Sequence, residues 1–320
     1  MAFKHLNLYA KEGALSLSVR KHYSSLFLLT AVLAVVMSAC SLNAGTSASG
    51  LSPSQVLQKS LTVMKSLKTQ HMTIHGTASI QASKTSTSSN PVTVGVATTG
   101  TGDQQGLDQH FTLANRINGH AANVSEVVSG NHDYIQNQHG KWYDVSSNQS
   151  VIQYSHLLTG VTIDKVLLDS GVVDLKLVDH HDEKLNGASV RHLTATFNKA
   201  ALTQLLQQSS KLRNSFGQQT LSQIISSAKS ANLIVDVWID ESTFYISQTE
   251  FNLNLVANTS GATKIVPLAG MTTAEAVVNF SGFNQPISNA IVVPSNATAT
   301  NSLETVFGLT PKKFVQKLVG

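Results

Sequence analysis

The chain has 320 residues, of which 42% are hydrophobic and 12% are charged, and its formal net charge is +4. Four of its 22 basic and one of its 18 acidic residues lie in residues 1–39, which leaves 18 basic and 17 acidic residues beyond that segment. This balance excludes the basic surface typical of nucleic-acid binding, so no nucleic acid is expected as a partner.

The N-terminal segment has the parts of a secretory signal. The basic pair Arg20-Lys21 precedes an apolar run, Leu26–Val36, which ends in Met37-Ser38-Ala39-Cys40. Small residues directly before a cysteine resemble a bacterial lipobox, in which the cysteine is lipidated and becomes the new N-terminus. The alternative, a transmembrane anchor, is disfavoured because the run is shorter than the roughly 20 residues that span a bilayer.

We therefore predict a signal peptide at residues 1–39 and a lipidated, flexible tether at residues 40–51. Cys40 is the only cysteine in the chain, so no intramolecular disulfide competes for its thiol. Its lipid would anchor the protein in the cell envelope, on the outer face of the cytoplasmic membrane. An outer membrane is possible if the host has one.

Ordered structure is expected to begin with a helix at residues 53–68. Ser52, Pro53 and Gln55 form its start, in which Ser52 and Gln55 make a capping box. After this helix, the spacing of the hydrophobic residues changes from a helical period of 3.6 residues to a strand period of two. Met72, Ile74 and Ile80 alternate with polar residues, which predicts a strand with His71, Thr73 and His75 toward solvent. Further strands are expected at 92–99, 107–113, 122–128, 134–135 and 141–145, and later at 233–240, 244–256 and 276–281.

Between these groups of strands the pattern is mixed. It predicts a short helix at 164–170, a hairpin with arms 172–180 and 188–197, and a helical stretch from Asn198 to about residue 229. Residues 82–91 are expected to be a polar hairpin loop. The tail, residues 295–320, is expected to be a linker followed by a short amphipathic helix, which would pack on its own domain or lie on a membrane surface.

Motifs that would indicate catalysis are absent from the sequence, which contains no Gly-x-Ser-x-Gly and no His-Glu-x-x-His. We therefore predict that the protein is not an enzyme and needs no cofactor; a hydrolase with an unrecognised site is the remaining alternative. The glycine-rich segment 100–106 is interpreted as a turn, because a strand rather than a helix follows it. The cluster Asp179–Glu183 is interpreted as a solvated hairpin tip in preference to a metal site.

Four segments together resemble the LppX/LprA/LprF/LprG lipoprotein family. These are Ser52–Gln81, Gly140–Val145, Val235–Asp240 and Phe280–Ile287. The resemblance implies a LolA-like domain at residues 52–294, of the α+β class, with a strongly curved, largely antiparallel sheet that forms a half-barrel. Helices would pack on its concave face, and an apolar cavity between the layers would hold acyl chains.

On this resemblance we predict a lipoprotein that binds or carries a lipid or an acylated molecule without catalysis. The alternative is a sensory or protein-interaction lipoprotein of the same fold, with a filled cavity and an envelope protein as its partner. Alternation places ten side chains on apolar strand faces, and the resemblance implies that these faces converge on the cavity. They are Met72, Ile74, Ile80, Val94, Phe111, Leu113, Val237, Ile239, Phe251 and Leu253.

Overall fold

The computed structural model describes residues 50–82, 92–106, 108–121, 123–130, 132–145, 177–208, 225, 228–257, 268–288, 290–300 and 306. The signal peptide, Cys40 and most of the tether lie outside these residues. So do the predicted helices at 164–170 and near the C-terminus, and most of the predicted loop 82–91. Among the described residues, no helix combines the length and apolar character needed to cross a membrane.

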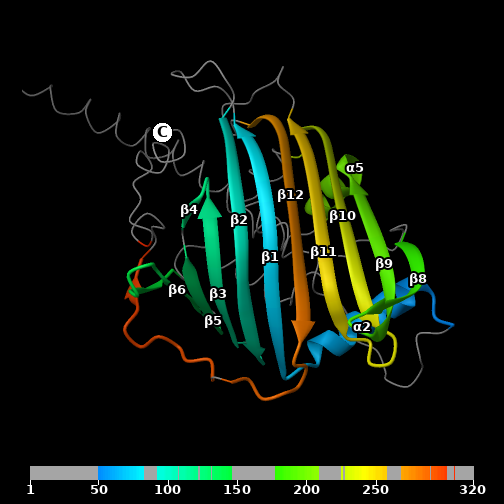
Figure 1. Ribbon diagram of the computed structural model, residues 1–320, viewed down its shortest axis with the longest axis horizontal. Helices are drawn as coiled ribbons and strands as arrows, with labels where there is room; N and C mark the ends of the chain where they lie inside the picture. Colours follow the sequence, from blue (N-terminus) through cyan, green and yellow to red (C-terminus); the bar gives the residue numbers. More distant parts are fainter. Residues whose placement is uncertain are drawn as a thin grey trace, which may run out of the picture.

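The described part of the chain is mostly β-structure, arranged in one open and largely antiparallel sheet (Figure 1). Its strands are β1 (Thr69–Ala82), β2 (Val92–Gln105), β3 (Asp108–Ile117), β4 (His120–Ala121), β5 (Val124–Ser129), β6 (His132–Gln136), β7 (Trp142–Asp144), β8 (Leu177–Leu185), β9 (Ala188–Asn198), β10 (Ala228–Asp240), β11 (Ile246–Ala257), β12 (Leu268–Ser281) and β13 (Thr298–Ala299). The helices are α2 (Pro53–Lys65) and α5 (Lys199–Gln208).

Two antiparallel meanders make up this sheet. In the order β13-β7-β6-β5-β3-β2-β1-β12-β11-β10-β9-β8, nearly every neighbouring pair is also adjacent in sequence. The exception at the centre is β1 with β12, where Met72 pairs with Phe280 and Gly76 with Ala276. This pairing joins the N-terminal and C-terminal meanders into one continuous sheet.

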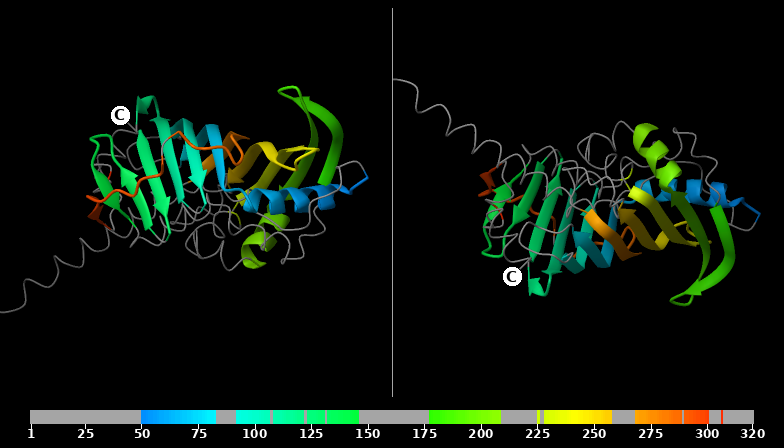
Figure 2. Two further views of the ribbon diagram at one scale, coloured as in Figure 1. Left: turned by 90° about the horizontal axis from the view of Figure 1, so that it is seen from below. Right: turned by 90° about the horizontal axis from the view of Figure 1, so that it is seen from above.

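Helix α2 begins as its sequence predicts. The Ser52 hydroxyl accepts a hydrogen bond from the Gln55 backbone, and the Gln55 side chain accepts one from the Ser52 backbone, which completes the capping box. Helices α2 and α5 lie over the part of the sheet formed by β8–β11 (Figure 2). Helix α2 contacts β8, β10 and β11, and α5 contacts β9 and β10.

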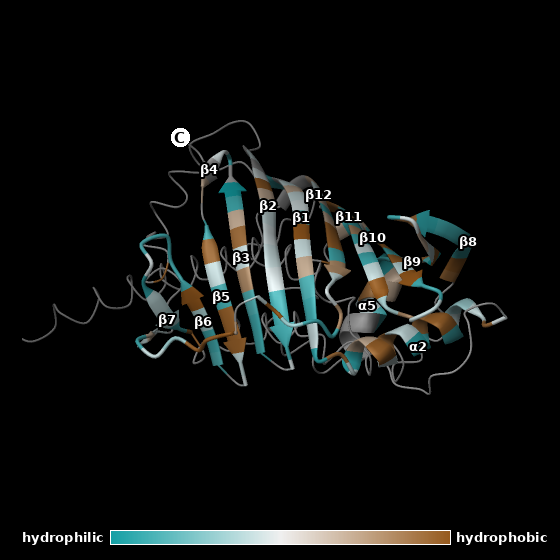
Figure 3. Cartoon of the chain, turned by 60° about the horizontal axis from the view of Figure 1, so that its bottom comes forward, coloured by the Kyte–Doolittle hydropathy of each residue, from teal (hydrophilic) through white to brown (hydrophobic). Residues whose placement is uncertain are grey.

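Alternation along the strands agrees with the predicted period of two. In β1, Met72 is 5% exposed, whereas Thr73 and His75 are exposed. His71 is half-exposed, and its Nδ1 lies 2.7 Å from Oδ1 of Asp103 on β2. Apolar and polar bands alternate in the same way along β3 and β5 (Figure 3).

Three sequence-based predictions of local structure are wrong. Residues 100–105 are strand, not turn, because β2 continues to Gln105 and only Gly106 turns, with a φ of 60°. Residues 179–183 belong to β8 and are no hairpin tip; the tip is Asn186-Gly187. The helix does not extend to residue 229, because Ala228 already pairs with Ala257 in the sheet. In each case long-range strand pairing overrides a weak local preference.

The C-terminal tail contributes to the sheet. Strand β13 pairs in parallel with β7, and the Thr300 backbone donates to the carbonyl of Asp144. Val306 is fully buried in a small apolar cluster with Ile135, Tyr143 and Val145. Residues 298–300 and Val306 therefore pack on the domain, in the segment where the sequence predicted a linker.

Candidate functional site

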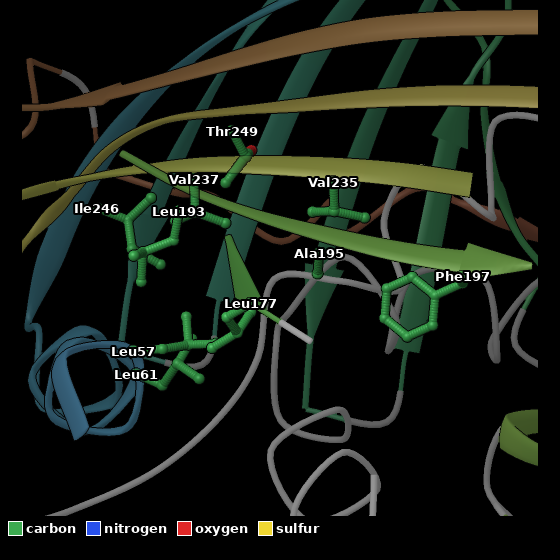
Figure 4. Close-up of a pocket in the computed structure, with 10 residues that line it drawn as sticks. All are labelled: Leu57, Leu61, Leu177, Leu193, Ala195, Phe197, Val235, Val237, Ile246 and Thr249. Carbon is green, nitrogen blue, oxygen red and sulfur yellow. The ribbon is translucent and has the colours of Figure 1, made fainter. Parts of the chain in front are cut away.

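An apolar pocket lies between α2 and the strands β8–β11 (Figure 4). Leu57 and Leu61 reach into it from the helix, and the remaining lining comes from strands β8–β11 of the sheet. Nine of its ten lining side chains are apolar, and Thr249 is the exception. The lining residues are Leu57, Leu61, Leu177, Leu193, Ala195, Phe197, Val235, Val237, Ile246 and Thr249.

Local sequence pattern explains how each side of the pocket is formed. Leu57 and Leu61 are four residues apart and share one face of α2. On the sheet, Leu193 and Ala195 of β9, and Val235 and Val237 of β10, are two residues apart and point to one face. The register aligns Val237 with Leu193 and Val235 with Ala195, so the two pairs form one apolar surface under the helix.

The pocket is small in this conformation. Its volume is about 30 Å³, enough for about two water molecules. A ligand of more than a few atoms needs more room than this conformation offers.

An ion pair lies next to the pocket on the same face of β9. Arg191 precedes Leu193 by two residues, and its Nε lies 3.0 Å from Oδ2 of Asp179 on β8. Both side chains are mostly buried. The hydrogen bond from Arg191 lowers the pKa of Asp179, so the pair is charged at neutral pH.

The structure brings only part of the predicted cavity lining to this pocket. Of the ten residues, Val237 lines it. Met72, Phe111, Ile239, Phe251 and Leu253 are buried in the same large core cluster, with Ile74 and Leu113 partly buried against it. The side chains of Ile80 and Val94 lie outside the described part of the structure. The cavity role of the ten residues stays a prediction.

Sequence reasoning missed the residues that α2, β8 and β9 contribute. Their alternation was visible in the sequence, as in Leu193, Ala195 and Phe197. The local pattern did not show that α2 packs on β8, β10 and β11, where it forms one side of the pocket.

A buried carboxyl pair lies in the other meander. Glu126 of β5 is 4% exposed and Asp133 of β6 is 1% exposed. Burial raises the pKa of Glu126 to about 7, against the opposing effect of its hydrogen bond with Asp133. A carboxyl group with such a pKa is partly protonated at neutral pH and can donate a hydrogen bond there.

No protein-family model and no curated protein sequence matches the chain. Among solved structures it is similar to the lipoprotein LppX of Mycobacterium tuberculosis, at 14% identity over 74% of this chain and 99% of that chain, with a TM-score of 0.36. LprF of Mycobacterium bovis matches at 13% identity over 79% of this chain and 100% of that chain, also with a TM-score of 0.36.

A third similar structure is a β-barrel-like protein of a domain of unknown function from Brucella abortus. It matches at 8% identity over 68% of this chain and 100% of that chain, with a TM-score of 0.20. LppX and LprF belong to the lipoprotein group that the sequence resembles.

Proposed function

We propose that this protein is a membrane-anchored lipoprotein that binds an acyl chain of a lipid or lipidated molecule, without catalysis, in the pocket under α2. The observation that carries the proposal is the lining of that pocket, in which nine of ten side chains are apolar. Each methylene group transferred from water to such a site contributes about 0.8 kcal/mol. In this proposal the sheet is a LolA-like half-barrel whose concave face is covered by α2 and α5.

Helix α2 is suited to move as the cover of this site. Its attachment to the sheet uses side chains: the Met64 sulfur accepts a hydrogen bond from the Ile246 backbone at 3.3 Å, and the Lys59 ammonium lies 4.0 Å from the centre of the Phe244 ring. Outward movement of α2 would break these contacts and leave the strand pairing intact. The pocket would then lengthen between β8 and β11.

A second candidate is a lipoprotein of the same fold that binds another envelope protein and keeps its cavity filled. The small size of the space under α2, about 30 Å³, favours it. Val292 and Val293 are 73% and 43% exposed and offer an apolar contact to such a partner. Bound lipid distinguishes the two candidates.

The test is to fill the pocket. Ala195 is 8% exposed and lines the pocket, so Ala195→Trp should occupy the space that an acyl chain would take. Thr73→Trp, at an exposed position of β1, is the matched control. The full chain is titrated with a fluorescent fatty acid in detergent below its micelle concentration.

We expect saturable binding by the wild type and by Thr73→Trp, and its loss in Ala195→Trp. Thermal melts show whether the variant remains folded, since overpacking a core costs about 1–3 kcal/mol. Equal binding by a folded Ala195→Trp variant would contradict the assignment of this pocket.

A further inference from the structure

A second group of side chains lies on the opposite face of β8, β9 and β10 from the pocket. His192 and Thr194 alternate with the pocket residues Leu193 and Ala195 and therefore point away from α2. Asp236 and Trp238 alternate with Val235 and Val237 in the same way. The register aligns Asp236 with Thr194 and Trp238 with His192, so these side chains are neighbours.

His180, His192 and Asp236 converge on one point of this surface. One ligand atom from each of the three side chains lies within 4.8 Å of the others. Nε2 of His192 is 2.9 Å from Oδ1 of Asp236. The Thr194 hydroxyl donates a hydrogen bond to the Asp236 carboxylate, and its oxygen also lies 2.8 Å from Nε2 of His180. Imidazole nitrogens with a carboxylate oxygen are a ligand set typical of zinc.

The backbone of β8 is irregular where this cluster forms. The pairing of β8 with β9 shifts between Asp179 and Asp182, and His181 has a φ of 64°. In a regular strand His180 and Glu183, three residues apart, would point to opposite faces. The bulge turns both toward His192. Bulges are known to re-aim side chains in this way, and positive φ is uncommon outside glycine.

Glu183 orients the imidazole of His192. Its Oε1 lies 3.0 Å from Nδ1 of His192, and its Oε2 accepts a hydrogen bond from Nε1 of Trp238 at 3.1 Å. The His192 ring is further held between the rings of His180 and Trp238, at centroid distances of 4.4 and 4.3 Å. A carboxylate on the far nitrogen of a histidine fixes the tautomer whose other nitrogen can bind a metal.

We propose that His180, His192 and Asp236 bind a divalent transition-metal ion, with zinc as the best match, and that Glu183 positions His192 for this role. Tetrahedral zinc with bonds near 2.0 Å holds its ligand atoms about 3.3 Å apart. The exposed His180 has the freedom to close the remaining gap by rotating its side chain. The ion would join the edge strand β8 to β10 across β9 and keep one coordination position open.

The test uses the purified full chain with no histidine tag. Cys40→Ser is introduced throughout, since a free thiol would also bind zinc. Zinc binding is titrated by calorimetry, and cobalt substitution is followed by its visible absorption and by quenching of Trp238. The chain has two tryptophans, so Trp142→Phe leaves Trp238 as the only tryptophan, which is excited selectively at wavelengths where tyrosine does not absorb.

We expect one ion per chain, with binding abolished in His192→Ala and in Asp236→Asn. Glu183→Gln should weaken it by about 10–100-fold, as is usual for a group that orients a ligand. His71→Ala is the matched control, because His71 also faces an aspartate on the sheet, at 2.7 Å, but belongs to no group of three converging ligand atoms among the described residues.

A bound ion also stabilises the folded state, so zinc should raise the melting temperature of the wild type and of His71→Ala. Asp236→Asn preserves side-chain shape and separates a folding defect from loss of a ligand. No binding by the wild type would overturn the proposal, as would zinc affinity unchanged in His192→Ala or lost equally in His71→Ala.

Discussion

Glu126 is an acidic residue buried within the sheet, at 4% exposed. Burial raises the pKa of its carboxyl from 4.5 to about 7. An acid with a raised folded-state pKa stabilises the fold fully below its unfolded-state pKa, and this stabilisation is lost as the pH rises through the folded-state value. The effect of Glu126 on stability should therefore decline between about pH 4.5 and pH 7.

We predict that the free energy of unfolding falls by up to about 3 kcal/mol over this range through Glu126 alone. Urea denaturation at pH 5 and pH 8 measures it. Glu126→Gln should remove this part of the pH dependence, whereas the exposed Glu275→Gln should leave it in place. Identical pH profiles for wild type and Glu126→Gln would show that Glu126 ionises freely in the folded state.

Two glycines of β2 make room for large side chains of the neighbouring strand. A Cβ added to Gly102 would lie 2.5 Å from the Phe111 ring, and one added to Gly100 would lie 2.3 Å from the Thr112 carbonyl oxygen. Phe111 is 2% exposed and belongs to the main core. These glycines thus serve close packing within the sheet, not a phosphate-binding loop.

We expect Gly102→Ala to lower the free energy of unfolding by about 1–3 kcal/mol, the usual cost of overpacking. Gly95→Ala is the control on the same strand, because its added Cβ would have only an ordinary contact, 3.8 Å from the Asn118 side chain. Urea denaturation of both variants tests the prediction. Equal effects would mean that the tight approach at Gly102 is relieved without cost.

At the level of elements, local signals predicted α2 and most strands. The capping box at Ser52 and Gln55 and the alternation around Met72 needed no knowledge of distant residues. The bulge at His181, the extension of β10 to Ala228 and the strand β13 arise from pairing between segments far apart in sequence. For the same reason, the family resemblance implied an apolar cavity, but the sequence did not show that Leu57, Leu193 and Ala195 would line the pocket.

For the whole molecule, the central pairing of β1 with β12 means that neither meander is a separate unit. The C-terminal tail adds β13 and Val306 to the edge of the sheet that lies opposite β8. The anchoring of the protein to a membrane remains a prediction, which depends on the segment Met37-Ser38-Ala39-Cys40. A lipid on Cys40, joined through residues 41–51, would hold the domain near a membrane surface.

Cys40→Ala should move the protein from the membrane fraction to the supernatant when it is expressed in a bacterial host. The reason is that the thiol is the attachment point of the predicted lipid. Immunoblotting of carbonate-washed membranes measures the distribution. A variant that still sediments with the membranes would place the anchor elsewhere in the chain.

Native mass spectrometry of the wild-type protein released from detergent shows whether the pocket under α2 holds an acyl chain. We predict a bound mass that corresponds to a lipid or an acylated molecule, and its absence from the Ala195→Trp variant. A wild-type protein that carries no lipid, and binds none when lipids are added, would contradict acyl-chain binding in this pocket and favour the partner-binding lipoprotein.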